Sequence, residues 1–123
     1  MFKDSTASLF DSFAALLEYP SSDFSEHAQE CLELMRSLHP EAADMVEKFA
    51  NAVEKNSLQR MQELFTTTFD MQPVCYPYAG YQLFGESYKR GAFMAQLNEA
   101  YRAFGYSSGE ELPDHLAVIL RFL

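Results

Sequence analysis

The sequence has no tryptophan and only two cysteines, Cys31 and Cys75, which lie far apart and form no CxxC pair. So few cysteines exclude a disulfide framework and fit a reduced, cytoplasmic setting. No apolar run approaches the ~18 residues of a membrane span. The N-terminus also lacks the charged and apolar regions of a signal peptide. We therefore predict a cytoplasmic protein whose residues 1–123 form one domain.

Basic residues are scarce as well. Nine Lys and Arg stand against 18 Asp and Glu, which gives a formal net charge of −9. Nucleic acids and anionic membranes bind to clustered Lys and Arg, so both are disfavoured as main partners. The charge permits a basic partner, for example a peptide that carries arginines, although acidity can also serve solubility alone.

The common motifs of nucleotide binding and hydrolysis are missing, since the chain has no GxGxxG, GxxxxGK[ST], GxSxG or HExxH. His27 and Cys31 have a spacing that suits a metal on one helix. A third ligand would have to come from elsewhere in the chain: Cys75, His39 or His115. Cys31 also belongs to an apolar stripe, so we interpret it as a core residue. We predict no enzyme activity, no cofactor and no metal.

Apolar residues make up 48% of the chain and recur at helical spacing. This pattern predicts an all-α fold, a single-domain bundle of about six helices. Polar caps and prolines mark the helix starts, which we expect near Ser5, Ser22, Pro40, Ser57, Ser87 and Pro113. The inward stripe of the third helix includes Met45 and Phe49.

The helical pattern breaks at residues 70–86, DMQPVCYPYAGYQLFGE, which hold two prolines, two glycines and three tyrosines. A connection of this length in a compact domain is often functional. Tyr76, Tyr78 and Tyr81 either fix the loop to the bundle or line a groove, since tyrosine combines apolar area with a hydrogen-bonding tip. The basic pair Lys89–Arg90 most simply flanks an exposed helical turn.

The closing segment EELPDHLAVILRFL, residues 110–123, places ionisable groups just ahead of an apolar run. Acids at this point either favour the helix start through its dipole or accept bonds from a basic ligand. The stripe of the closing helix has no evident partner: Leu116, Ile119, Leu120 and Leu123. We expect either a fold truncated at its C-terminus or a second copy that covers this stripe in a homodimer.

Four stretches together resemble a known family: FAALLEYPSSDF at 13–24, ELFTTTFD at 63–70, FGESYKRGAFMAQLNEAYRAFGY at 84–106 and ELPDHL at 111–116. Their order and spacing are similar to those of the nitrate reductase delta-subunit chaperones. These belong with the all-helical maturation chaperones of the dimethyl sulfoxide reductase type. The resemblance covers nearly all of the chain but only the front part of the family fold, because members continue through further helices.

The resemblance implies a cytoplasmic chaperone that binds the apo catalytic subunit of a molybdenum oxidoreductase, in the first instance a nitrate reductase. Such chaperones bind an arginine-containing leader peptide and assist insertion of the molybdenum cofactor. The tyrosine-rich loop leans toward the sister chaperones, which leaves the client open. Two alternatives are a permanent structural subunit of a redox complex and a carrier of a nucleotide or pterin.

The resemblance also implies the peptide-binding residues. The box associated with peptide binding matches five of them, Glu111, Pro113, Asp114, His115 and Leu116, and the Arg-Gly element matches Arg90. Tyr78 and Tyr81 are the aromatic candidates from the loop.

The chemistry of these residues is compatible with peptide binding. Carboxylates such as Glu111 and Asp114 can accept bonds from peptide arginines, worth about 1.5–3 kcal/mol when well formed but about 0–1 kcal/mol at an exposed surface. Most of the affinity is therefore expected from apolar contacts with a helical peptide. Because His115 neighbours these acids, we expect its positive form to be favoured, so that affinity varies between about pH 5 and 8.

Overall fold

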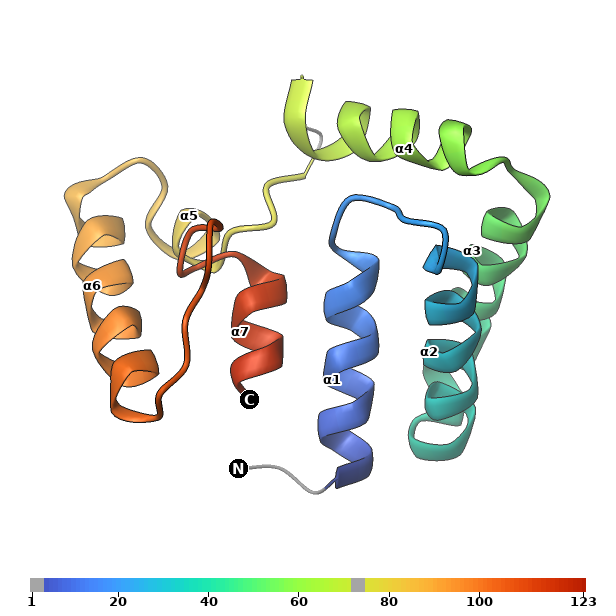
Figure 1. Cartoon of the computed structure of the whole chain (residues 1–123), viewed down its shortest axis with the longest axis horizontal. Helices are drawn as coiled ribbons and strands as arrows, with labels where there is room; N and C mark the ends of the chain where they lie inside the picture. The colour runs from blue at the N-terminus through green and yellow to red at the C-terminus, as the bar shows by residue number, and fades with distance from the viewer. Residues whose placement is uncertain (1–3, 72–74) are drawn as a thin grey trace.

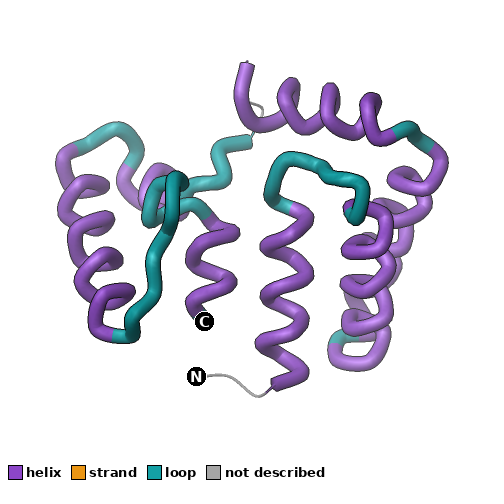
Figure 2. Tube along the Cα trace, viewed as in Figure 1, coloured by secondary structure: helices purple, strands orange, loops and turns teal. Residues whose placement is uncertain are grey.

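The computed structural model describes residues 4–71 and 75–123 and confirms the all-α prediction (Figure 1). This part of the chain contains no β-strand, and Figure 2 shows helices joined by loops. The elements are α1 (Asp4–Leu16), α2 (Phe24–Leu38), the 3-10 turn η1 (Pro40–Ala42), α3 (Ala43–Lys55), α4 (Leu58–Thr66), the π-helical turn η2 (Thr67–Met71), α5 (Ala79–Phe84), α6 (Tyr88–Ala103) and α7 (Leu116–Phe122). Across the described residues, no helix is long and apolar enough to cross a membrane.

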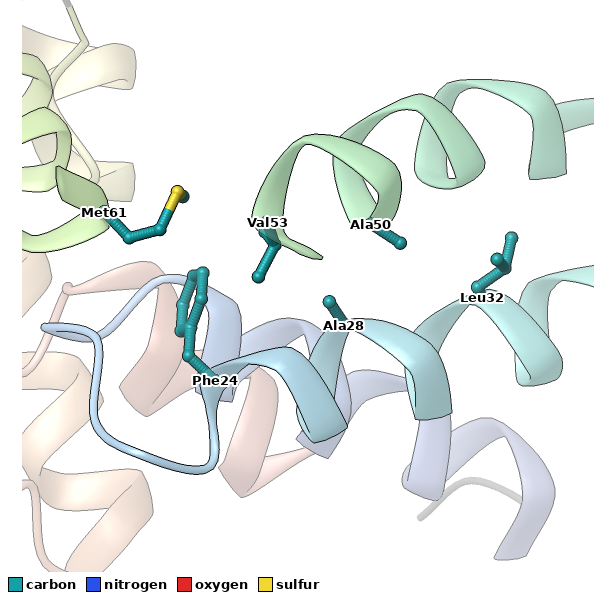
Figure 3. Close-up of a cluster of buried hydrophobic side chains, with 6 residues drawn as sticks. All are labelled: Phe24, Ala28, Leu32, Ala50, Val53 and Met61. Atoms are coloured by element: carbon teal, nitrogen blue, oxygen red, sulfur yellow. The ribbon is translucent and has the colours of Figure 1, made fainter. Parts of the chain in front are cut away.

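The helix α2 lies at the centre of the core, packed against α1 on one side and α3 on the other (Figure 1). One cluster joins buried side chains of α2, α3 and α4 (Figure 3): Phe24, Ala28, Leu32, Ala50, Val53 and Met61. Ala28 and Ala50 are completely buried, and their small side chains let the two helices approach closely. Cys31 is also fully buried, in a second cluster with Leu9, which confirms its interpretation as a core residue.

The end of the chain lies beside its beginning, because α7 packs along α1 (Figure 1). Ala117 and Val118 are the buried residues of α7, whereas Leu116 remains 38% exposed. The predicted stripe of α7 is therefore only partly covered. Helix α6 lies on the outer side of α7, packs chiefly against α5, and buries only Tyr101.

Three details of the sequence prediction are wrong. The segment predicted as loop contains the short helix α5, which ends at Gly85 with φ of +65°. The closing helix begins at Leu116 rather than at Pro113, because His115 is its cap. Met45, predicted to point inward, is 78% exposed, since α3 turns its other face toward α2.

Candidate functional site

The loop before α5 and the loop before α7 are bonded to each other through their backbones. Tyr78 and His115 form an isolated antiparallel bridge. The Ala79 amide donates to the Asp114 carbonyl at 2.8 Å, and the Leu116 amide donates to the Pro77 carbonyl at 2.8 Å. This pairing brings the two segments that the sequence singled out, one tyrosine-rich and one acidic, into direct contact.

Asp114 is fully buried and joins three elements. Its Oδ2 accepts from Arg90 Nε at 2.8 Å and from the Gly80 amide at 3.2 Å, while Oδ1 accepts from Arg90 Nη2 at 3.1 Å. Such a bidentate, charge-assisted pair fixes geometry as well as supplying energy. The hydrogen bond that Arg90 donates to Asp114 is the main reason that the pKa of Arg90 is raised. Arg90 therefore does not simply flank an exposed turn, as the sequence suggested.

Tyr78 links this buried pair to the surface. The Arg90 guanidinium lies 5.2 Å from the centre of the Tyr78 ring, which is a cation–π distance. The Tyr78 hydroxyl donates to Glu111 Oε1 at 3.2 Å, and burial, followed by the charge of Glu111, raises the pKa of Tyr78. The same ring meets His115 edge-on, with 5.2 Å between ring centres. Tyr78 thus holds the exposed acid Glu111 in place.

His115 is a buried, neutral cap of α7. Its Nδ1 accepts from the Ala117 amide at 3.1 Å, so the ring proton lies on Nε2. The side chain is only 6% exposed, and burial lowers the pKa of His115 below its ordinary value of 6.5 although Glu111, Glu18 and Asp114 act in the opposite direction. The expectation that the positive form is favoured is therefore wrong, because desolvation outweighs the neighbouring acids.

Pro113 and Tyr81 complete the set of predicted residues. The Pro113 carbonyl accepts from the Tyr101 hydroxyl at 2.7 Å, which ties the loop before α7 to α6. Burial raises the pKa of Tyr101 to about 12. Tyr81 instead stacks on Tyr76, with 4.2 Å between ring centres, at the surface of α5.

An acidic pocket of about 610 Å³ opens beside the loop before α7. Its charged and polar lining includes Glu18, Asp70, Tyr78, Tyr106, Glu111, His115 and Arg121. Arg121 of α7 forms an ion pair with Glu18, and the hydrogen bond that Arg121 donates to this carboxylate is the main cause of the raised pKa of Arg121. With Tyr19, which also lines it, the pocket therefore combines three carboxylates, three tyrosines and the guanidinium of Arg121.

An apolar groove of about 750 Å³ adjoins the acidic pocket. Helices α1, α2, α3, α4 and α7 all contribute to it, with a lining that is almost entirely apolar: Phe13, Leu16, Leu17, Pro20, Phe24, Phe49, Ala52, Asn56, Met61, Leu64, Phe65, Thr68, Phe69, Leu116 and Leu120. Three residues, Leu17, Phe65 and Phe69, line both the groove and the pocket. The two hollows, one apolar and one acidic, therefore lie next to each other and share part of their walls.

The structure sorts the predicted residues into three groups. Tyr78, Glu111 and His115 line the acidic pocket, and Leu116 lines the apolar groove. Asp114, Arg90 and Pro113 lie behind them and fix their positions, whereas Tyr81 lines neither hollow.

Sequence reasoning missed Glu18 and Arg121, and it assigned Phe65 and Phe69 only to a helix stripe. Glu18 and the two phenylalanines lie within the stretches FAALLEYPSSDF and ELFTTTFD, whose similarity to a family was the only signal available for them. Among the described residues, no group of three or more His, Cys, Asp and Glu side chains could hold a metal ion.

Comparison with known proteins gives two findings. The sequence profile of the family described as nitrate reductase delta subunit matches residues 35–123. A solved structure from Archaeoglobus fulgidus, of a protein assigned to redox enzyme maturation, superimposes with a TM-score of 0.68 at 22% sequence identity. The match covers 100% of this chain and 72% of that one, and at this identity it shows a shared fold. No curated protein matches the chain significantly.

Proposed function

Since the chain belongs to the nitrate reductase delta-subunit family, we propose that it is a cytoplasmic chaperone for the apo catalytic subunit of a molybdenum oxidoreductase. It binds the N-terminal leader peptide of that subunit and keeps the subunit open while the molybdenum cofactor is inserted. The observation that carries this proposal is that the apolar groove and the acidic pocket lie next to each other and share lining residues.

The apolar groove suits one face of an amphipathic helix. Its walls come from five helices, and its side chains include phenylalanine and methionine, which adapt to different partners. Each apolar side chain that a peptide buries there contributes on the order of 1.5–3 kcal/mol. Most of the affinity is therefore expected from this part of the surface.

The acidic pocket suits the basic residues of the same peptide. Exposed ion pairs contribute only about 0–1 kcal/mol each, so the acids select the peptide and speed its encounter more than they tighten the complex. The net charge of −9 acts in the same direction, because it attracts basic segments over a longer range.

The bonds around Asp114 hold this surface in shape. Asp114 has no exposed area, and both of its oxygens already accept hydrogen bonds from the chain. We therefore assign Asp114 and Arg90 to positioning rather than to peptide contact. Glu111 and Leu116, which are exposed, are the residues of the box that we assign to direct contact.

The test is affinity capture from the cytosol of the source cells, followed by mass spectrometry of the retained proteins. We expect a molybdenum oxidoreductase catalytic subunit to be retained, and its synthetic N-terminal peptide to bind in calorimetry. Phe49→Ser opens the wall of the groove and is expected to weaken peptide binding about tenfold. Met45→Ser is the matched control, because it removes an exposed apolar side chain from the same helix outside the groove.

Two results would contradict the proposal. One is the retention of no such subunit by the wild-type chain. The other is equal loss of binding in the Phe49 and Met45 variants, which would show that the groove is not the binding surface.

A further inference from the structure

The ion pair between Glu18 and Arg121 joins the turn after α1 to α7 at the acidic pocket. We propose that Glu18 is the carboxylate that binds an arginine of the leader peptide, and that Arg121 occupies its place in the free protein. The chain thus carries an internal competitor for its own ligand. This inference rests on the proposed function and adds to it the residue that reads the peptide's cation.

The position of Glu18 supports this assignment. It directly follows Leu17, one of the three residues that line both the apolar groove and the acidic pocket. A helix seated in the groove would therefore bring a basic residue at its end next to Glu18. Glu111 is less available, because its Oε1 already accepts from the Tyr78 hydroxyl at 3.2 Å and from the Leu112 amide at 3.0 Å.

The Glu18–Arg121 pair itself shows that a guanidinium fits at this carboxylate. Arg121 is the chain's own side chain, but its charged group is chemically the same as that of a peptide arginine. The two side chains are 44% and 41% exposed, so the pair is screened by solvent. It therefore favours the paired position of Arg121 over a displaced position by no more than about fivefold in population. A peptide arginine that is held nearby by the groove can therefore displace it.

A displaced Arg121 has another place to go. Its side chain also lines a second hollow of about 480 Å³ between α1 and α2, together with Asp11 and Glu30. The pKa of Arg121 is raised first by the hydrogen bond that it donates to Glu18, and the charge of Asp11 is among the smaller influences in the same direction. The guanidinium can thus move from one group of acidic residues to another and stay charged, so the exchange costs little free energy.

The experiment measures peptide affinity by calorimetry, with two versions of the leader peptide of the captured subunit. One carries its natural arginines, and the other carries citrulline, the neutral analogue of arginine, in their place. Arg121→Gln is expected to bind the arginine peptide about twofold to fivefold more tightly than the wild type, with no gain for the citrulline peptide. Glu18→Gln is expected to lose most of the wild type's preference for the arginine peptide, and Arg121→Lys to behave as the wild type.

Arg36→Gln is the matched control. It breaks an ion pair of similar exposure between α2 and α3, Arg36 to Glu47 at 3.5 Å, at a distance from both hollows. It makes the net charge of −9 more negative by the same amount as Arg121→Gln, so a general effect of charge would appear in both variants. Circular dichroism of each variant confirms that the fold is kept.

The outcomes separate the inference from the proposed function. If the wild-type chain binds neither peptide, the proposed function fails. If it binds the arginine peptide but Arg121→Gln gives no gain or a loss, the competitor role is wrong. If Arg121→Gln does not fold, Glu18→Gln decides alone, and a preference for arginine over citrulline as large as that of the wild type overturns the inference.

Discussion

The carboxylate of Asp114 is buried without any exposed area, while Arg90, its partner, retains 21% exposure. Replacing Asp114 by Asn keeps the shape of the side chain but leaves the guanidinium without its counter-charge. We expect Asp114→Asn to lower the free energy of unfolding by about 2–4 kcal/mol, measured by urea denaturation. Glu111→Gln removes a carboxylate from the same loop at an exposed position and should cost less than about 1 kcal/mol.

Equal effects of these two substitutions on stability would contradict the structural role of Asp114. The stability of the Asp114 variant also matters for the proposed function. A variant that is partly unfolded is expected to lose peptide binding even though Asp114 makes no contact with the peptide. Binding measurements on such a variant are meaningful only below its unfolding transition.

Protonation of His115 should destabilise the fold. Its pKa in the folded chain is lowered by burial, so the unfolded chain binds the proton more readily once the pH falls toward 6.5. The stabilisation is therefore present above the unfolded value and is lost as the pH falls through the folded pKa. His115→Asn keeps a good capping side chain but does not titrate. When the pH is lowered from 7.5 to 5.5, the midpoint of urea unfolding should fall further for the wild type than for this variant.

A wild type and a His115→Asn variant with the same pH dependence would show that His115 takes up no proton on unfolding in this range. The sequence alone pointed the other way for this residue, because it shows only the neighbouring acids. The burial that decides the sign depends on packing that the sequence does not show, such as the contact with the Tyr78 ring, which lies far from His115 in sequence.

At the scale of the helical elements, α5 is held against the loop before α7 by the small size of Gly80. A Cβ atom at this position would lie 2.6 Å from Asp114 Oδ2 and 3.0 Å from both Arg90 and Phe93 side-chain carbons. Gly80→Ala should therefore push α5 away and weaken the Asp114–Arg90 pair, with a loss of about 1–3 kcal/mol in the free energy of unfolding.

Gly91→Ala in α6 is the natural comparison. Nothing lies within 4 Å of a Cβ at that position, and alanine favours the helix, so this variant should gain about 0.4–1 kcal/mol. Thermal or urea unfolding of both variants shows directly whether each substitution raises or lowers the free energy of unfolding. A tolerated alanine at position 80 would mean that α5 is not tightly seated on the Asp114 carboxylate.

The long helices were predictable because each needs an apolar face at a helical period. Helix starts were expected at Asn56 or Ser57 and at Ser87, and in the structure the hydroxyls of Ser57 and Ser87 accept from the Arg60 and Lys89 amides at 3.1 and 3.3 Å. Helix α5 was not predictable in this way, since six residues are less than two turns and carry no period. Its position depends on Gly80 and Asp114, which are 34 residues apart in sequence.

At the scale of the whole molecule, the apolar groove that we propose as the binding surface is lined by five helices, some of which are distant in sequence. The sequence shows which residues are apolar, but it does not show that α7 lies along α1 (Figure 1). This packing brings residues of α7 into the lining of the apolar groove. Resemblance to a family found the box at 111–116 but did not distinguish the residues that line the surface from those that support it. The predicted homodimer through α7 stays a prediction.

Uneven packing across the molecule should appear in amide hydrogen exchange. Helix α2 buries five side chains, whereas α6 buries only Tyr101 and packs chiefly against α5. Because slow exchange follows buried contacts, amides of α2 should exchange about tenfold or more slowly than those of α6. Mass spectrometry measures the exchange of both helices in one experiment. It is carried out at two protein concentrations so that protection by self-association can be recognised.

Addition of the leader peptide extends the same experiment to the binding surface. Protection should rise in α1, α4 and α7, which line the apolar groove, and stay unchanged in α6, which does not. If α6 is as protected as α2 in the free chain and this protection rises with concentration, self-association covers it. If the peptide protects α6 instead of α1 and α4, the peptide binds on the α5–α6 side, because an amide gains protection only where a contact forms or a local opening is suppressed.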